Sequence, residues 1–495
     1  MTHITVVGGG LAGMITALRL LERGCTVTLY ERSQRLGGQA GSNVVNGRTI
    51  DHGFHIFPMW YRNILSLFDE LGIRDHFKPV SKFNQLNAGD FPNFKYFEDI
   101  ASARTFWQNL NSGILPVADI FLFYYTGLEL MAASAGRDRG LDQVSISGFV
   151  HSRWYTNKQA VLELQDLLLK AASAPNYRFS SMTMQLMLKY WVRYPSPQYN
   201  IARGSLAEQW IGPIQERLTA LGCQFVFGHN LERVHVNDGR VSALTFRHVE
   251  TGETVEHPVE VMVSAIPPLD FIPLLDDDLF EAAPDLSKIE YLDAEPMAAL
   301  NIYCKTRIEG IPPEHVGLTN SRYDLSFIDV SQTWPDLIAE GRTVLNVVSS
   351  DYTELKNVTS EEATHAILTE MRRFIPGLED DNIEWTYLQP HLTEPLFMNY
   401  VGSWPYRPDP NVRTQIPNLY ITGTHTQTNI DLATMESAVE AGLRTAEAVR
   451  KDLKLTPPVK LLVPEKPPHG LLVAGKYLLM PAALIAKIWT LLTNE

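Results

Sequence analysis

The sequence predicts an α/β fold in which one parallel sheet is built from distant stretches of the chain. Residues 2–30 have the pattern of a strand, a glycine turn, a helix and a second strand. A strand that leads into another glycine turn and a helix returns at residues 418–454. Between them, apolar strand patterns at 222–227 and 261–266 flank a hairpin with an Asn-Asp-Gly turn. We therefore expect a Rossmann-like domain interleaved with a second, α+β part of mixed sheet plus helices.

Composition narrows the class of protein. The 495 residues are 45% apolar, which is enough for two packed domains or one interleaved pair. Three scattered cysteines indicate a reducing compartment and argue against a disulfide framework or a cysteine-based metal site, so no metal is expected. The net charge of −14 disfavours nucleic acid as a partner. No signal peptide precedes the first strand pattern, and no apolar run reaches membrane-spanning length without a charge or proline. A cytoplasmic protein is expected.

The first glycine turn has the spacing of a dinucleotide fingerprint. Gly8 permits the tight turn, Gly10 lets the backbone approach a pyrophosphate, and Gly13 lets the helix lie close to the strand. Leu11 and Ala12 stand at the start of that helix, where N–H groups and the positive dipole end favour phosphates. The strand, turn, helix and second strand follow in order, so we interpret this segment as a cofactor site.

The second strand ends on Glu31, 18 residues after Gly13. A carboxylate there can accept hydrogen bonds from ribose hydroxyls and repels a 2′-phosphate, so FAD or NAD fits better than NADP. Arg32 follows, and a second glycine turn comes soon after it. This Glu-Arg…Leu-Gly-Gly run resembles FAD enzymes of the amine oxidase and carotenoid desaturase superfamily. The resemblance implies FAD as the cofactor, with backbone close to the pyrophosphate and isoalloxazine at Gly37, Gly38, Gln39 and Ala40.

The block at residues 51–63 makes the resemblance more specific. It is similar to the Gly-Leu-His-x-Phe-Phe-x-x-Tyr-x-Asn block of plant and cyanobacterial phytoene and ζ-carotene desaturases. Squalene-type desaturases are the other close group. The resemblance implies cofactor contacts at Gly53, Phe54 and His55. Residues of this chain that match the block are Gly53, His55, Phe57, Tyr61 and Asn63.

The resemblance continues toward the C-terminus, where it implies that a strand-glycine segment and a helix start close the flavin site. The helix N-terminus would face the flavin edge on which negative charge develops. It also implies that a residue placed like Val234 covers the adenine. Thr424 stands where most of the superfamily has an acid and ζ-carotene desaturases have Ser, and Gln209 stands where plant phytoene desaturases have Arg. The implied contacts are Gly423, Thr424, Thr434, Met435 and Ala438.

These matches give a domain prediction. Residues 1–80, 201–270 and 401–454 would form the discontinuous FAD-binding domain. Residues 81–200 and 271–400 would form the substrate-binding domain. The second domain is rich in long apolar and aromatic side chains, which read as ordinary core but are also the material of an apolar substrate tunnel.

Few residues are expected to act as acids or bases, because FAD supplies the electronic chemistry. His55 is the first candidate, either as a polar group or proton acceptor beside the flavin or as a histidine that orients a loop. His425 lies near the isoalloxazine or, as we favour, in a solvent-facing loop. Lys305 would be catalytic in an amine oxidase, and a surface lysine is the more ordinary interpretation.

The resemblance implies an FAD-dependent oxidoreductase that dehydrogenates C–C bonds of a carotenoid or related isoprenoid lipid. The electron acceptor would be a quinone or O2. A carotene cis–trans isomerase that uses reduced FAD is an alternative, and a flavin amine oxidase is another. A flavin-binding protein without activity also remains open, since a fold does not fix a function.

The tail at residues 455–495 is expected to be a proline-marked linker and an apolar, basic segment. Such a tail on an acidic protein can lie on a membrane surface, and a helical hairpin docked on its own domain is the alternative. With a lipid-soluble substrate, the first interpretation predicts peripheral association with the cytoplasmic membrane.

Overall fold

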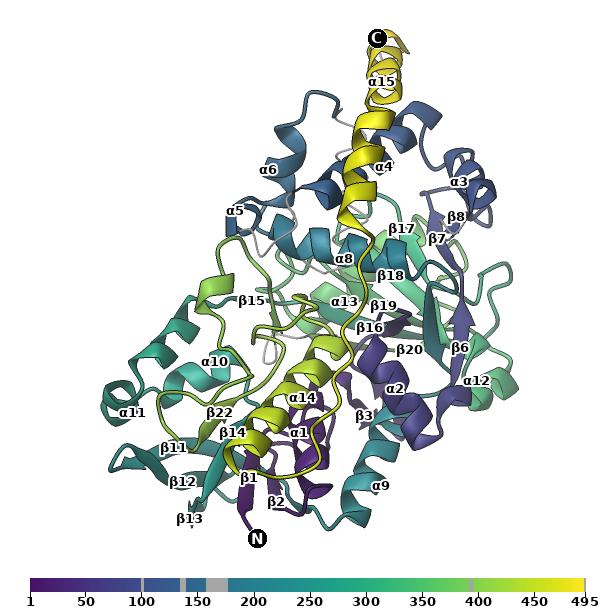
Figure 1. Cartoon of the computed structure of the whole chain (residues 1–495). Coiled ribbons are helices and arrows are strands. Elements are labelled where there is room, and N and C mark those ends of the chain that lie inside the picture. Colours follow the sequence, from purple (N-terminus) through teal and green to yellow (C-terminus); the bar gives the residue numbers. More distant parts are fainter. Residues whose placement is uncertain (99–101, 134–138, 157–176, 391–394, 494–495) are drawn as a thin grey trace.

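The computed structural model describes the whole chain except residues 99–101, 134–138, 157–176, 391–394 and 494–495 (Figure 1). The three cysteines are buried and free, as the sequence indicated.

A five-stranded parallel sheet forms the centre of one half of the molecule, in the order β10-β2-β1-β14-β22. The apolar strand patterns explain it, because both faces are covered and residues such as Ile4 and Val6 are fully buried. Helices α1 and α14 lie side by side on this sheet (Figure 1). The bounds are β1 His3–Val7, β2 Thr26–Tyr30, β10 Gln224–Val226, β14 Val261–Ser264, β22 Leu419–Ile421, α1 Leu11–Leu21 and α14 Met435–Asp452.

Glycine sets the spacing of α1. A Cβ on Gly13 would lie 2.0 Å from the carbonyl oxygen of Gly8, and one on Gly442 would lie 2.6 Å from that of Ala12. Both approaches are closer than any side chain permits, so these glycines let α1 contact the β1 turn and α14 directly. The role predicted for Gly13 is confirmed.

The predicted hairpin is present as an antiparallel sheet of β11 (His229–Asn237), β12 (Arg240–His248) and β13 (Thr254–Pro258). Asp238 and Gly239 at its turn both have positive φ, 51° and 69°. Two consecutive left-handed residues are what the Asn-Asp-Gly signal predicts.

The second half is built on a seven-stranded mixed sheet in the order β20-β16-β19-β18-β17-β7-β8. Its β17–β7 pair is parallel and its other pairs are antiparallel. Helix α13 (Ser360–Arg372) packs its apolar face against this sheet. The expected mixture of a parallel-sheet domain and a mixed-sheet part is therefore confirmed. The strand bounds are β7 Lys82–Leu86, β8 Lys95–Glu98, β16 Ala298–Cys304, β17 Val316–Leu318, β18 Leu325–Asp329, β19 Val344–Ser349 and β20 Ile383–Pro390.

A helical layer covers the far end of the molecule, where α15 packs along α4 (Figure 1). Its helices are α3 Ala103–Leu110, α4 Val117–Ala132, α5 Arg139–Asp142, α6 Ile146–His151, α8 Ser181–Arg193 and α15 His469–Thr493. Further elements are β3 Ser42–Val45, β4 Arg48–Asp51, β5 Ile56–Pro58, β6 Phe77–Val80, β9 Tyr199–Ala202, β15 Ala294–Glu295, β21 Leu396–Phe397, α2 Arg62–Leu71, α9 Gly212–Ala220, α10 Pro268–Phe271, α11 Asp277–Ala282 and α12 Pro335–Glu340.

Candidate active site

A cavity of about 990 Å³ begins at the carboxyl ends of the parallel strands and extends into the helical layer. Residues that directly follow β1, β2, β14 and β22 line its first part. This edge is where open parallel sheets bind ligands. Nearly all the cofactor residues implied by the sequence resemblance lie in its wall, and the exceptions are Gly13 and Val234.

The first glycine turn leaves room for a ligand. Gly8 has φ 109°, a conformation that favours glycine, and Gly10 caps α1 without a capping side chain. A Cβ on Gly10 would meet no atom within 4 Å, so the backbone borders open space at the helix N-terminus. Leu11 and Ala12 line the cavity next to it. This is a fitting place for a pyrophosphate.

Glu31 is held at the end of β2 with its side chain in the cavity wall. One carboxylate oxygen accepts a hydrogen bond from the N–H of Gly9 at 2.7 Å, and the other accepts one from the N–H of Ser33 at 2.8 Å. Arg32 also lines the cavity and forms an ion pair with Asp270 at 3.1 Å. The carboxylate is thus fixed in the position from which it would meet ribose hydroxyls.

The predicted place of Val234 beside the adenine is corrected by the structure. Its side chain is 1% exposed and packs in the same cluster as Leu244 and Phe246, away from the cavity. Residues from the start of the strand line the cavity instead, because the N–H of His229 donates a hydrogen bond to the carbonyl of Glu31 at 3.1 Å, which holds this end of β11 beside the end of β2. They are His229, Asn230 and Leu231.

The second glycine turn packs directly on the first. Gly37 donates its N–H to the carbonyl of Gly9 at 2.8 Å, and Gly10 and Gly37 form a parallel bridge. A Cβ on Gly38 would lie 3.3 Å from the Cα of Gly10. Gln39 and Ala40 continue the cavity wall. The two turns therefore form one continuous backbone cradle.

Gly53, Phe54 and His55 line the cavity opposite this cradle. The Nδ1 of His55 lies 3.0 Å from the carbonyl oxygen of Gly53. Since a carbonyl only accepts, Nδ1 carries the hydrogen and Nε2 keeps a lone pair. Burial lowers the pKa of His55 to about 4, so the ring is neutral at physiological pH.

The C-terminal segment closes the cavity with Gly423, Thr424 and the first turn of α14. Thr434 caps this helix by accepting the N–H of Ser437 at 3.2 Å, and Met435 and Ala438 also line the cavity. The helix N-terminus is therefore at the cavity wall, where it favours negative charge.

His425 is a second correction, because it lies in the cavity wall and not in a solvent-facing loop. It is 2% exposed, and among the described residues no hydrogen-bond partner is present for its Nε2. Burial, with the Arg407 guanidinium nearby, lowers the pKa of His425 to about 3. A ligand in the cavity could supply a partner for this buried ring atom.

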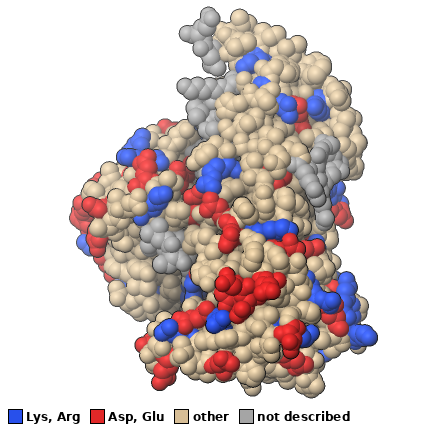
Figure 2. Space-filling view, turned by 90° about the vertical axis from the view of Figure 1, so that its left-hand side faces the viewer, with Lys and Arg blue, Asp and Glu red and all other residues tan. Residues whose placement is uncertain are grey.

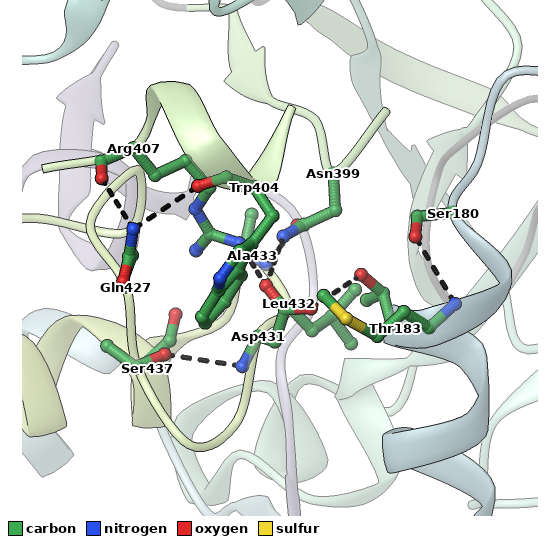
Figure 3. A network of polar contacts seen from close by, with 12 residues as sticks. Ser180, Thr183, Asn399, Trp404, Arg407, Gln427, Asp431, Leu432, Ala433 and Ser437 are labelled. Atoms are coloured by element: carbon green, nitrogen blue, oxygen red, sulfur yellow. Dashed lines mark hydrogen bonds and ion pairs between the residues drawn. The ribbon is translucent and has the colours of Figure 1, made fainter. Parts of the chain in front are cut away.

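A buried charge network holds the loop that carries His425 (Figure 3). Arg407 donates to the carbonyl oxygens of Thr424, His425 and Thr426, and it forms an ion pair with Asp431. Both charged side chains are 1% exposed. This ion pair was not predicted from the sequence, although a charged residue between an aromatic residue and Pro408 was a usable signal.

The same network extends to helix α8. The second carboxylate oxygen of Asp431 accepts the hydroxyl of Thr183 in α8 at 2.9 Å (Figure 3). Asn399 also donates to Asp431, at 3.2 Å. Arg407 and Asp431 therefore join the loop of residues 423–426, called the cofactor loop below, to α8, which borders the second half of the cavity.

Glu436, the second residue of α14, ties this helix to α2. Its buried carboxylate accepts the N–H of Asn63, the side-chain amide of Asn63 and the N–H of Ile64, at 2.8–2.9 Å. Asn63 and Ile64 lie in the first turn of α2, so the carboxylate also faces a positive helix end. This contact positions the block that begins at Gly53.

Burial raises the pKa of Glu436 to about 8, so the prediction for Glu436→Gln does not depend on its charge. We expect this change to lower the free energy of unfolding by about 1–3 kcal/mol, because the amide nitrogen would face an N–H donor of α2 and leave it buried without an acceptor. Urea unfolding of the apoprotein measures it. Glu290→Gln, at an exposed glutamate, is the matched control and should change stability by less than about 0.5 kcal/mol. Equal stability of the two variants would contradict the assigned role of Glu436.

The second half of the cavity is a mostly apolar tunnel between α4 and α8. Its side chains come from apolar segments whose residues were expected to be mostly ordinary core. Trp191 lines the cavity, as the tunnel interpretation allowed, whereas Leu122 and Tyr190 are core residues. Aromatic residues in this wall are Phe106, Phe121, Phe123, Tyr124, Tyr125, Phe149 and Trp191.

Lys305 is a surface lysine, the more ordinary of the two interpretations that the sequence offered. It is exposed after the end of β16, where its Nζ donates to the carbonyl of Asp381 at 2.5 Å. It does not line the cavity, so the main support for an amine oxidase is removed. The described residues include no group of three or more His, Cys, Asp or Glu that could hold a metal ion.

Known proteins are similar to this chain in sequence or in fold. The chain is 25% identical over 488 residues to the zeta-carotene desaturase of Synechocystis sp., covering 90% of this chain and 97% of that protein. It is 24% identical over 475 residues to the 15-cis-phytoene desaturase of Arabidopsis thaliana, covering 91% and 80%. The cyclohexylamine oxidase of Brevibacterium oxydans shares the fold, with a TM-score of 0.64, 15% identity and 92% and 99% of the two chains covered.

The family comparison agrees with the cavity. Residues 11–450 match the flavin containing amine oxidoreductase family. This range begins at the first residue of α1 and holds the second glycine turn, the block at 53–55 and the start of α14. The chain therefore belongs to this family, and it is an FAD-dependent oxidoreductase.

Proposed function

We propose that this enzyme dehydrogenates a C–C bond of a carotenoid or related isoprenoid lipid. The observation that carries the proposal is one cavity that joins the glycine cradle to an aromatic tunnel between α4 and α8. A long apolar substrate fits such a wall, and the desaturases named above act on carotenes. A cationic amine finds less support, since Lys305 lies outside the cavity.

Different parts of the cavity would bind the substrate, bind FAD and accept the proton. The tunnel side chains hold the polyene and exclude water, while the cradle and the N-termini of α1 and α14 hold FAD. FAD supplies the hydride acceptor, and one proton must also leave the substrate. His55 can accept that proton at Nε2, because its ring is neutral and its Nδ1–H is already donated to Gly53.

We expect His55→Asn to lower kcat about 100-fold with FAD still bound, the size of a typical general-base contribution. The wild-type rate should be flat between about pH 6 and 8, because the pKa of His55 lies near 4 and the base stays unprotonated there. Steady-state kinetics across pH and an FAD titration test this. Weak FAD binding with unchanged kcat at saturating FAD would assign His55 to loop orientation instead.

A quinone or O2 is the proposed electron acceptor, and a cytoplasmic enzyme is the proposed setting. Without an acceptor, the FAD-loaded enzyme should form product in a single turnover. Adding a quinone or O2 in separate assays then shows which of the two supports further turnover.

Product analysis tests the proposed reaction. The FAD-loaded protein is incubated with detergent-dispersed phytoene, ζ-carotene or squalene and an acceptor. A product lighter by two hydrogens, formed in step with acceptor reduction, supports dehydrogenation. A product of unchanged mass that needs pre-reduced FAD would show an isomerase, and peroxide released with amines would show an amine oxidase.

A further inference from the structure

Helix α15 is unusual among the described helices because most of its apolar surface is uncovered. It has 25 residues, and its most apolar 18-residue window has a mean hydropathy of 1.7 with 17% of that window buried. At 1.5 Å per residue it is about 37 Å long, enough to cross the hydrocarbon core of a membrane. Residues seven positions apart form a fully outward stripe. They are Leu471, Leu478, Ile485 and Leu492, at 70%, 80%, 69% and 73% exposure.

The two lysines of α15 contact the protein. The Nζ of Lys476 lies 3.1 Å from a carboxylate oxygen of Glu129 in α4, and the Nζ of Lys487 donates to the carbonyl of Thr156 at 2.8 Å. The helix contains no Asp or Glu between His469 and Thr493. On the same inner side, Ala483 packs with Leu122 and Tyr125 of α4. Both ammonium groups are thus used to dock α15, and the outer face is left apolar.

The surroundings of α15 share this character. Charged side chains crowd the lower part of the face shown in Figure 2, and the upper end, where α15 lies in Figure 1, is mostly uncharged. Large aromatic residues are exposed on or beside α15, as at a membrane interface. They are Tyr477 at 63%, Trp489 at 61% and Trp154 at 53%.

Leu479 connects this surface to the substrate tunnel. It lines the cavity together with side chains of α4 and α8, and it is still 38% exposed. Leu479 is the residue of α15 in the cavity wall, so the tunnel reaches the helix that carries the outward apolar stripe.

We propose that α15 lies in one leaflet of a lipid bilayer with its outward stripe among the acyl chains, so that the tunnel opens into lipid at Leu479. Because Lys476 and Lys487 hold the helix on the protein, α15 is seated on one side of the membrane and does not span it. The proposed contact with the bilayer is inferred from the features of α15 and does not depend on the proposed function. The use of this opening by a hydrophobic substrate rests on the proposed function, and it would spare that substrate from crossing water.

The test is flotation of the full-length, FAD-loaded protein with phosphatidylcholine–phosphatidylglycerol vesicles. The variant Leu478→Glu with Ile485→Glu places charges in the outward stripe, away from the cavity wall. The control variant Val249→Glu with Ile338→Glu changes exposed apolar residues elsewhere, at 58% and 50% exposure. We expect the wild type and the control to float, and the α15 variant to lose at least about tenfold in bound fraction.

Two further measurements distinguish failure of the bilayer contact from failure of the proposed function. Wild-type binding should survive about 1 M NaCl, where charge attraction is screened, because insertion is apolar. Conversion of detergent-dispersed carotene by the α15 variant should match the wild type, so failure of all proteins in that assay counts against the proposed function and not against the bilayer contact. The proposal is overturned if the wild type stays with the soluble fraction, if the α15 variant floats equally well, or if the stripe proves to hold a dimer that the variant converts to a monomer.

Discussion

Gly10→Val should abolish FAD binding without unfolding the protein, whereas Gly13→Val should unfold it. Gly10 has φ −72°, which any residue adopts, and its Cβ would meet no atom within 4 Å. The new side chain would project into the space that the pyrophosphate needs, and we expect FAD affinity to fall at least about 100-fold, or about 2.7 kcal/mol. A Cβ on Gly13 would instead lie 2.0 Å from a backbone oxygen that cannot move aside.

Fluorescence titration with FAD and thermal unfolding of the apoproteins measure the two effects separately. The Gly10 variant should melt like the wild-type apoprotein. The Gly13 variant should lose several kcal/mol of stability or fail to fold, because overpacking against backbone leaves α1 no relaxed position. Tight FAD binding by the Gly10 variant would place the pyrophosphate elsewhere, and normal stability of the Gly13 variant would refute the close contact of α1 with the turn.

Arg407→Met should lower the free energy of unfolding by about 3–5 kcal/mol at pH 7, as is typical when one partner of a buried ion pair is removed. The change leaves Asp431 buried without its cation and takes the donor from three carbonyl oxygens of the cofactor loop. FAD affinity should fall as well, because Gly423, Thr424 and His425 line the cavity. Arg407→Lys keeps the charge without the forked donors and should recover part of the stability.

The loss should shrink in acid. Burial already raises the pKa of Asp431 to about 6, and without Arg407 it rises further. A carboxyl with a raised folded pKa contributes stability that is present at low pH and is lost as the pH rises through that value. Urea unfolding of wild type and Arg407→Met at about pH 5 and 7.5 should therefore give the larger difference at pH 7.5. A difference independent of pH would show that the lost backbone bonds, and not the unpaired Asp431, dominate.

Local spacing explains what the sequence could predict. The turn from Gly8 to Gly13 and the acid at Glu31 belong to one strand–turn–helix–strand segment, so their spacing can be seen in about 30 consecutive residues. The Asp238-Gly239 turn is shorter still. Such features can be predicted from sequence because a short stretch carries the whole pattern.

The errors arose where distant contacts decide. His425 is buried because Arg407 and the rest of a folded network cover its loop. Val234 lies in the core because the course of β11 past the cavity depends on its pairing with β12. The stripes of α4 and α8 show a limit of periodicity, since an apolar face pattern is the same whether the face packs on core or borders a tunnel.

An anaerobic absorbance spectrum tests the central claim most directly. The spectrum of the FAD-loaded protein is recorded before and after the addition of vesicles that carry phytoene, ζ-carotene or squalene. Empty vesicles are the control. The account predicts that the oxidised flavin band bleaches only with an isoprenoid and returns when an acceptor is admitted. A band that no isoprenoid bleaches, in protein shown to bind FAD and to take up the lipid, would contradict dehydrogenation of isoprenoids by this enzyme.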